Sequence, residues 1–564
     1  MARIVSNPTQ REANVDKESN MRKANAFLVG LAALGFTALA PAAYASTCGD
    51  LNNNGVLDAG DTVILTQRIF GSPNAADCGG AGTLQCGDMN GTGTLTVADL
   101  VVLLNAVAGN PVVFNCTAPG TAVCNVTRSS SINANETWGN ATPPGTGCTT
   151  TINGTTFVQP GVIVTIQPGA RVQGVKGAAT PSVLVFLPGS KINAAGTPAN
   201  PIVFTSNQPD GSRGIGDWGG VVINGKAPVN CPTGKCLAEG LTGIEFGGTD
   251  PNDSSGVLQY ARIEFSGIEL SPDNELNILT QNGVGRGTLM DHIQCNHGFD
   301  DCFEWFGGTV NEHHLVASSC GDDDFDWQLG YTGSIQFGLS IKDAGNCDNN
   351  GRHGFEADNN ETGFNFLPRS NPKFCNITTI GTVAQGQTGT GRRGALLRRG
   401  TAGKIFNTII DGFTESGVRL DDNATAEQAC LNSTTLKTTE PFLRIQDSIV
   451  FGNPTLANGS ATTPCTGAQW LGLLQTSANV STADPNLNET SVPYPVTSAL
   501  GASAADGYVP TAAGLVPSQD CTALDPSFFV SAPYVGAFQP GTGSAGNWLR
   551  DAGPGTAWIN FDTN

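Results

Sequence analysis

Short runs of β-branched residues, each closed by a glycine-containing turn, recur along the chain from about residue 148 onward. Such runs centre on Ile263, Ile293, Leu315, Ile341, Ile377, Ile409 and Ile449, at separations of 30, 22, 26, 36, 32 and 40 residues. A nearly constant strand with inserts of variable length is typical of stacked coils, because strands pack on strands and insertions leave as loops. An immunoglobulin-like sandwich would instead repeat its turn signals every ~8–12 residues. The pattern therefore predicts a mostly β chain folded as a right-handed parallel β-helix.

The charge content excludes several classes of protein. Only 13% of the residues are charged, the formal net charge is −20, and glycine supplies 73 of the 564 residues. So few charges do not fit a helical bundle, and an acidic chain has no basic surface with which to bind nucleic acid. No apolar run after the N-terminal segment reaches the ~20 residues of a membrane-spanning helix. We therefore expect no nucleic-acid partner and no integral membrane span.

The N-terminal segment has the three parts of a secretion signal. Arg22 and Lys23 form a positive region, residues 26–40 form an apolar stretch, and Ala43-Tyr44-Ala45 supplies the small residues of a cleavage site. We expect residues 1–45 to be a signal peptide with an upstream extension, cleaved after Ala45. The mature chain is then secreted or displayed at the cell surface.

The sixteen cysteines agree with export, because thiols outside the cytoplasm become oxidised to disulfides. Some cysteines are close enough in sequence to pair locally: Cys231 with Cys236, Cys295 with Cys302, and Cys320 with Cys347. The complete connectivity does not follow from sequence. No CxxC pair occurs, which disfavours a structural zinc site.

Two similar segments, beginning at Cys48 and Cys86, each contain a loop of oxygen-bearing residues followed by an apolar helix. A calcium ion takes roughly six to eight oxygen ligands, and a glycine in the loop permits the sharp turn around it. The ligands expected in the first loop are Asp50, Asn52, Asn54, Val56 through its carbonyl, Asp58 and Asp61. Those expected in the second loop are Asp88, Asn90, Thr92, Thr94, Thr96 and Asp99. The second loop has fewer carboxylates, which predicts weaker binding.

This duplicated loop and helix resembles dockerins and dockerin-like modules over residues 47–110. The resemblance implies a calcium-binding module that docks onto a protein partner or caps its own chain. Loop positions 10 and 11, often Ser-Thr in cellulosomal dockerins, are Ala59-Gly60 and Val97-Ala98 here. The sequence thus departs from the cohesin-binding pattern. We place this module at residues 46–112 and a linker at residues 113–149.

The remainder of the chain, residues 150–564, resembles a family of secreted bacterial β-helix proteins whose role is not established. The motifs that carry this resemblance are GDWGGVVINGKAPVN, LQYARIEFSG, DDCFEWFGGTV, GDDDFDWQLGYTGSIQFG and the closing NWLRDAGPGTAWINF. The resemblance implies a parallel β-helix domain and no defined activity.

Acidic residues gather between Asp291 and Asp358, a span that also holds all five histidines. Neighbouring coils of a β-helix lie ~4.8 Å apart, so the acids of one coil should lie beside those of the next. Carboxylates this close repel one another unless a cation or protons neutralise them. We therefore expect structural calcium, held by Asp300, Asp301, Glu304, Asp322, Asp323, Asp324 and Asp326.

Two other interpretations of this acidic centre stay open. The first is a catalytic cleft for polysaccharide, because parallel β-helices host lyases and glycosidases. The clustered cations that a lyase needs would be Arg392, Arg393, Arg398 and Arg399. The second is a set of solvated turns that keep the chain soluble.

The aromatic and histidine residues of this span have their own expected positions. We expect the aromatic rings to stack in the coil core: Phe303, Trp305, Phe306, Phe325 and Trp327. His313 and His314 are adjacent, which predicts that their side chains point to opposite faces of a strand and disfavours a shared zinc ion.

The leading hypothesis is a secreted or cell-surface, calcium-binding β-helix that acts in adhesion or extracellular assembly without catalysis. The alternative is a carbohydrate-active enzyme, a polysaccharide lyase or glycoside hydrolase, that carries a dockerin-like tag and binds polysaccharide. The sequence contains no recognisable catalytic motif, which favours the first hypothesis.

Overall fold

The computed structural model describes residues 62, 103–104, 107, 122–139, 148–271, 274–346, 352–384, 386, 392–487, 508, 510, 518–540, 547–550 and 558–561. The chain divides into two compact units, Met1–Gly79 with Cys86–Cys116, and Gly80–Gln85 with Thr117–Asn564. The expected signal peptide and both expected calcium loops, residues 50–61 and 88–99, lie outside the described residues. Within the described part, no helix is long and apolar enough to cross a membrane.

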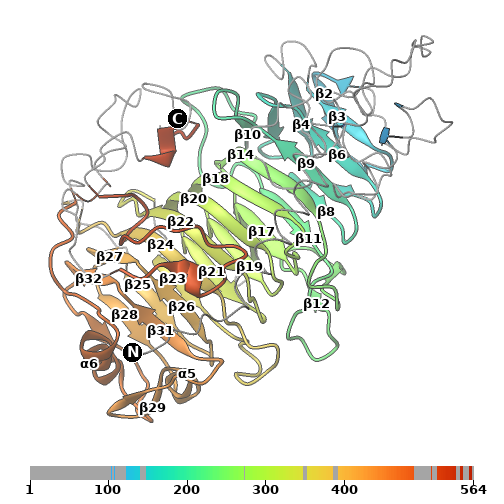
Figure 1. Cartoon of the computed structure of the whole chain (residues 1–564). Helices are drawn as coiled ribbons and strands as arrows, with labels where there is room; N and C mark the ends of the chain where they lie inside the picture. Colours follow the sequence, from blue (N-terminus) through green and yellow to red (C-terminus); the bar gives the residue numbers. More distant parts are fainter. Residues whose placement is uncertain are drawn as a thin grey trace, which may run out of the picture. The chain divides into compact units, whose positions relative to one another are not determined.

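The second unit is a parallel β-helix formed by two long sheets (Figure 1). Each coil contributes one long strand or two short strands to a 17-stranded sheet, and then one strand to a 10-stranded sheet. Thus β18 (Leu289–Gly298) is followed by β19 (Phe303–Phe306), and one coil later β20 (Asn311–Cys320) is followed by β21 (Phe325–Gln328). The pairs β18–β20 and β19–β21 are both parallel. The expected parallel β-helix is confirmed.

The strands of the larger sheet are β1 (Ala122–Val123), β2 (Val126–Arg128), β3 (Glu136–Trp138), β4 (Thr149–Ile152), β6 (Ile163–Ile166), β7 (Arg171–Gly174), β9 (Lys191–Ala195), β10 (Ile202–Ser206), β14 (Gly256–Glu264), β18, β20, β22 (Ser334–Ile341), β24 (Lys373–Ile380), β26 (Gly403–Phe406), β27 (Ile409–Asp411), β31 (Leu443–Gln446) and β32 (Ile449–Phe451). The smaller sheet contains β5 (Thr155–Val158), β8 (Val183–Phe186), β11 (Val221–Asn224), β17 (Leu279–Asn282), β19, β21, β23 (His353–Ala357), β25 (Arg393–Leu397), β28 (Ser416–Leu420) and β33 (Ala457–Asn458).

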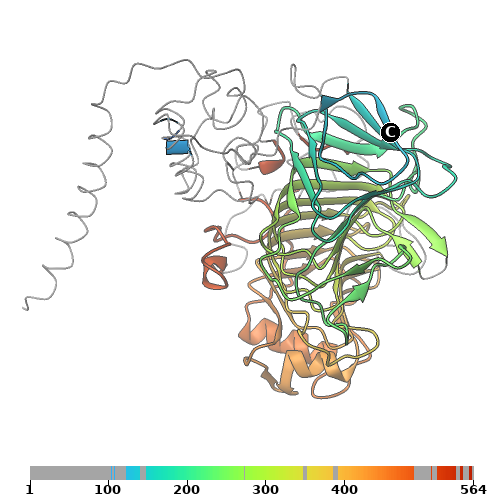
Figure 2. The ribbon, with the colours of Figure 1, turned by 90° about the vertical axis from the view of Figure 1, so that its right-hand side faces the viewer.

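Insertions between the coils form small antiparallel pairs. These are β12 (Cys236–Leu237) with β13 (Glu245–Phe246), β15 (Ile268–Ser271) with β16 (Asn274–Leu276), and β29 (Cys430–Asn432) with β30 (Thr435–Leu436). The helices described within residues 122–564 are α5 (Asn423–Ala429), α6 (Gly467–Ser477) and the 3-10 turns η3 (Cys521–Ala523) and η5 (Trp548–Arg550). Helix α6 begins at a capping box between Thr466 and Gln469. It lies with α5 at the orange end of the stack (Figure 2) and buries Trp470 in the core.

The stack begins before the expected boundary at residue 150. Strands β1, β2 and β3 lie within the segment expected to be a linker, and they already pair with strands of the larger sheet. The disulfide between Cys124 and Cys148 closes this first part of the stack, and Trp138 is fully buried there. Such short strands can form a coil because the apolar side chains of the neighbouring coil pack against theirs and complete the core.

The expected strand centres are all buried, but they do not form one column. Ile293 lies opposite Ala261 and Leu315, whereas Ile341 lies opposite Ser318 and Ile380. The long strands bend at residues with positive φ, such as His292 and His314 at 54° and 56°, where the ladder is interrupted. Spacing alone therefore gives the correct register for Ile293 with Leu315 and for Ile409 with Ile449, and a register wrong by one to three residues at the other steps.

The interior is an aromatic stack, as expected. Ring centroids lie 5.9 Å apart for Phe303 and Phe325, and 5.1 Å apart for Trp327 and Phe374. Trp305 belongs to the same interior cluster. The exception is Phe306, which packs on the other side of the smaller sheet with Phe246.

The C-terminal residues cross the outer face of the larger sheet, and we call residues 518–540, 547–549 and 558–561 the C-terminal strap (red in Figure 1). Amide side chains of the sheet bond to its backbone. The pairs are Gln294 with Asn560, Gln336 with Val530, Asn376 with Ala532 and Tyr534, and Asn407 with Gln519. A disulfide between Cys375 and Cys521 fixes the strap covalently.

The described cysteines form further disulfides, namely Cys231–Cys236, Cys302–Cys320 and Cys430–Cys465. The expected pair Cys231–Cys236 is confirmed. The expected pairs Cys295–Cys302 and Cys320–Cys347 are wrong, because the turn before β19 brings Cys302 to the end of β20, where Cys320 lies. Cys295 remains a buried thiol in the middle of β18.

Candidate functional site

Three carboxylates stack on successive strands of the smaller sheet. Glu304 on β19 lies opposite Asp326 on β21, which lies opposite Glu356 on β23. Their strand neighbours Trp305 and Trp327 point into the core, so alternation directs the carboxylates to the outer face. The sequence shows the origin of this column, because Phe-Glu-Trp, Phe-Asp-Trp and Phe-Glu-Ala repeat the same pattern at residues 303, 325 and 355.

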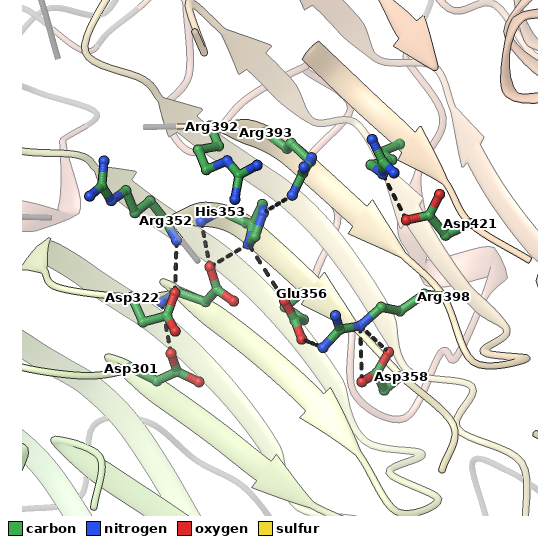
Figure 3. A network of polar contacts seen from close by, with 12 residues as sticks. Asp301, Asp322, Arg352, His353, Glu356, Asp358, Arg392, Arg393, Arg398 and Asp421 are labelled. Atoms are coloured by element: carbon green, nitrogen blue, oxygen red, sulfur yellow. Dashed lines mark hydrogen bonds and ion pairs between the residues drawn. The ribbon is translucent and has the colours of Figure 1, made fainter. Parts of the chain in front are cut away.

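A second group of acids occupies the turns that enter these strands. The backbone N–H of Asp323 donates to Asp301 Oδ1 at 2.7 Å, and that of Arg352 donates to Asp322 Oδ1 at 2.8 Å. His353, labelled in Figure 3, bonds to Asp323 Oδ1 through Nδ1 at 2.7 Å. Each turn carboxylate therefore fastens its coil to the next one, which is a structural role that these acids have without any ion.

The turn acids and the strand acids meet at Asp301. The ligand atoms of Asp301, Glu304 and Asp326 all lie within 4.8 Å of one another, and so do those of Asp300, Asp301 and Asp322. Asp326 is 8% exposed, and its Oδ1 has no hydrogen-bond partner among the described residues. Oxygen donors this close fit a hard cation such as calcium. We call Asp301, Glu304 and Asp326, with Asp300 and Asp322, the acidic cluster.

Burial and mutual repulsion oppose ionisation in the acidic cluster. Burial raises the pKa of Asp301, Glu304 and Asp326 well above the usual range, and the neighbouring carboxylates raise the pKa of each further. Glu239, in the insertion that carries β12 and β13, adds a further negative charge that raises the pKa of Glu304, and burial raises the pKa of Glu239 itself to about 7. The cluster must therefore be neutralised by protons or by a cation.

The four expected arginines lie at the two ends of β25, two coils beyond β21 on the same face, and Figure 3 labels Arg392, Arg393 and Arg398. Arg398 pairs with Glu356 and, at 3.0 Å, with Asp358, while Arg399 lies 2.7 Å from Asp358. Arg392 and Arg393 both pair with Glu415, at 2.7 and 2.8 Å. The face thus changes from acidic at β19 and β21 to basic at β25, with ion pairs across the boundary.

Asp324 does not join the acidic cluster. It lies among buried side chains, where Lys342 Nζ is 3.0 Å from its Oδ1 and Ser340 donates to its Oδ2 at 2.5 Å. Alternation around the turn sends Asp323 and Asp324 in different directions. No sequence pattern predicts the contact of Lys342 with Asp324, or the approach of Glu239 and Glu275 to the cluster, because these contacts depend on how the coils and loops pack.

Three histidines, His292, His313 and His314, pack against the strap. His292 and His314 stack at 4.1 Å, and the Nδ1 atom of each lies 2.8 Å from Asp291 Oδ1. The expectation that His313 and His314 point to opposite faces is wrong, because their ring centroids lie 5.9 Å apart. The positive φ of His314 breaks the alternation of the strand. His313 consequently stacks on Phe528 of the strap at 4.1 Å.

The ligands expected in the two N-terminal loops, Asp50 to Asp61 and Asp88 to Asp99, lie outside the described residues. Among the expected metal ligands, the structure therefore describes only those between Asp300 and Asp326, which include the acidic cluster.

A model of the family described as the pectate-lyase-like β-helix domain matches residues 145–463 of the chain. No curated protein and no solved structure matches the chain. The matched range includes the acidic cluster and the four arginines.

Proposed function

This chain belongs to the family of pectate-lyase-like β-helix domains, and we propose that it is an extracellular, non-enzymatic β-helix braced by calcium in its acidic cluster. The observation that carries the proposal is the buried carboxylate of Asp326, whose Oδ1 has no partner among the described residues while Asp301 and Glu304 lie within 4.8 Å of it. A buried anion without a partner is costly. A calcium ion would remove that cost.

The fit to calcium rests on the chemistry of the donor set. Asp301, Glu304 and Asp326 offer carboxylate oxygens, which calcium prefers over nitrogen or sulfur ligands. Glu304 is held in place by Gln328, which donates to it at 2.9 Å, and by Asn277. An ion bound there would connect β19 with β21 and stabilise the folded state only.

We further propose that export and docking use the N-terminal residues. A signal peptide would end at Ala45, and a dockerin-like module at residues 46–112 would bind calcium through its two loops and dock onto a protein partner. The disulfides of the described residues support an oxidising location. In this arrangement the β-helix, from about residue 122, is a rigid surface for adhesion or assembly.

The alternative is a carbohydrate-active enzyme, and the observation that favours it is the row of arginines beside the carboxylates. A lyase needs a basic group that can accept a proton from the sugar. Arg398 is instead held by Glu356 and Asp358, and these carboxylates raise its pKa despite burial. A cavity of about 360 Å³ lies beside Lys226, Lys235 and Glu245, and none of its lining residues belongs to the acidic cluster. The pairing of the charged groups therefore favours bracing over catalysis.

The test is the calcium dependence of unfolding, followed by tryptophan fluorescence. All seven tryptophans lie after residue 137, so their signal reports on the β-helix and not on the N-terminal loops. Calcium at about 100 times its Kd should stabilise the domain by about 2.7 kcal/mol. Asp326→Asn should abolish this response.

The matched control is Asp217→Asn. Asp217 is also a buried acid, but it pairs with Lys176 at 2.6 Å and lies outside the acidic cluster. This variant should keep the full response to calcium. The proposal is wrong if calcium does not change the unfolding free energy of the wild-type domain and the domain releases sugar products from a polysaccharide. The function would then be catalysis.

A further inference from the structure

Lys342 and Asp324 face each other inside the β-helix. Lys342 follows β22, Asp324 precedes β21, and both side chains are 0% exposed. The ammonium Nζ lies 3.0 Å from Asp324 Oδ1. We propose that these side chains condense to an intramolecular amide, an isopeptide bond that links two coils covalently.

The surroundings hold both reacting groups and exclude water. Ser340 donates to Asp324 Oδ2 at 2.5 Å and contacts Thr379 at 2.8 Å, and both hydroxyl residues are fully buried. Lys342 Nζ also donates to the carbonyl oxygen of Asp322 at 2.5 Å. The sulfur atoms of the Cys302–Cys320 disulfide lie within 4.8 Å of the Asp324 carboxylate. A buried amine is thus fixed against a buried carboxyl group.

The reaction needs no reagent from outside. A proton passes from Lys342 Nζ to Asp324 Oδ1 along their contact, which leaves a neutral amine and a neutral acid. The amine lone pair then attacks Cγ and forms the N–C bond. Ser340 donates to Oδ2, where negative charge develops. Oδ1 takes a second proton from the nitrogen and leaves as water. The ion pair has become one amide and one water molecule.

Burial favours this product over the ion pair. Two desolvated charges remain costly even when they are paired, whereas an amide carries no charge. Groups held in contact react as if at very high concentration, with effective molarities of about 10⁵–10⁸ M in well-oriented cases. The water that forms can leave for the solvent, because the buried site offers it few partners.

A second lysine provides a contrast within the same chain. Lys404 Nζ lies 2.6 Å from Glu440, closer than Lys342 lies to Asp324, but the Glu440 side chain is 60% exposed. Water stabilises that carboxylate and competes for its contacts. We therefore expect no bond between Lys404 and Glu440.

Mass spectrometry of the reduced, alkylated and denatured protein tests the proposal directly. Trypsin cuts after Lys342 only if its amine is free, and residues 287–341 contain no other lysine or arginine. We expect one uncut peptide of residues 287–352 that is lighter by about 18 Da, the mass of one water. Separate peptides 287–342 and 343–352 at full mass would overturn the proposal, and so would an uncut peptide without the mass deficit.

Variants locate the bond. Asp324→Ala should restore cleavage after Lys342 and full mass, and Ser340→Ala should lower the bonded fraction. Lys404→Met is the control and should leave the deficit at residues 287–352 unchanged. The measurement on the wild-type protein is decisive even if Asp324→Ala fails to fold. A deficit that persists in an unfolded or folded Asp324→Ala chain would assign the bond elsewhere and refute this pair.

Discussion

Replacing Glu312 with glutamine should stabilise the β-helix at pH 8 and leave its stability nearly unchanged at pH 4. Glu312 lies on β20 between Met290 and Ile335 of the neighbouring strands, and it is 0% exposed. Trp305 Nε1 donates to its Oε1 at 2.6 Å. Burial raises the pKa of Glu312 from 4.5 to about 7 even though the hydrogen bond from Trp305 lowers it.

The sign and size follow from linkage between protonation and folding. Below pH 4.5 the carboxyl group is protonated in both the folded and the unfolded chain, so it adds no pH dependence. Between pH 4.5 and about 7 only the unfolded chain releases the proton, and rising pH therefore favours unfolding. Above pH 7 the loss is complete at about 3 kcal/mol, because one pKa unit corresponds to about 1.4 kcal/mol. Glutamine keeps an acceptor for Trp305 and never ionises.

The assay is urea unfolding at both pH values, followed by tryptophan fluorescence with the disulfides intact. The free energy of unfolding of Glu312→Gln should exceed that of the wild type by up to about 3 kcal/mol at pH 8. The control is Glu245→Gln, because the Glu245 side chain is 59% exposed, and it should change stability by less than about 0.5 kcal/mol. An equal difference at both pH values would show that packing, not charge, distinguishes glutamate from glutamine, and would refute the reasoning.

Arg398→Met should destabilise the domain by about 3–5 kcal/mol in chemical denaturation, because Glu356 would remain buried without its arginine and Asp358 would keep only Arg399; a neutral effect would mean that water reaches these carboxylates. Cys521→Ser should cost about 2–4 kcal/mol by removing a disulfide that spans 146 residues. It should also make the strap the first site of limited proteolysis, and unchanged cleavage would show that the amide contacts alone hold the strap.

The sequence predicts structure where a pattern repeats along the chain, and it does not predict contacts between residues that are far apart in the sequence. The recurrence of glycine-closed strands predicted the parallel β-helix, and the stacking of its coils predicted that Glu304 lies near Asp326. The positive φ at His314 had no signal in the sequence, and it changed the direction of a side chain. The partner of Lys342 and the third acid of the column, Glu356 with its arginine, depend on packing between coils. Composition does not encode those distances.

The C-terminal strap has a consequence for the order in which the molecule can be completed. Val316, Leu339 and Ile341 lie under it, on the outer face of the larger sheet. A ribosome delivers residues 518–561 after all the strands of the two sheets, so these coils can stack while this apolar face and its amide side chains still lack their cover. The face accepts the strap of any copy equally well, because the contacts are the same. Crowded synthesis would therefore favour domain-swapped pairs, in which each chain is closed by the end of the other.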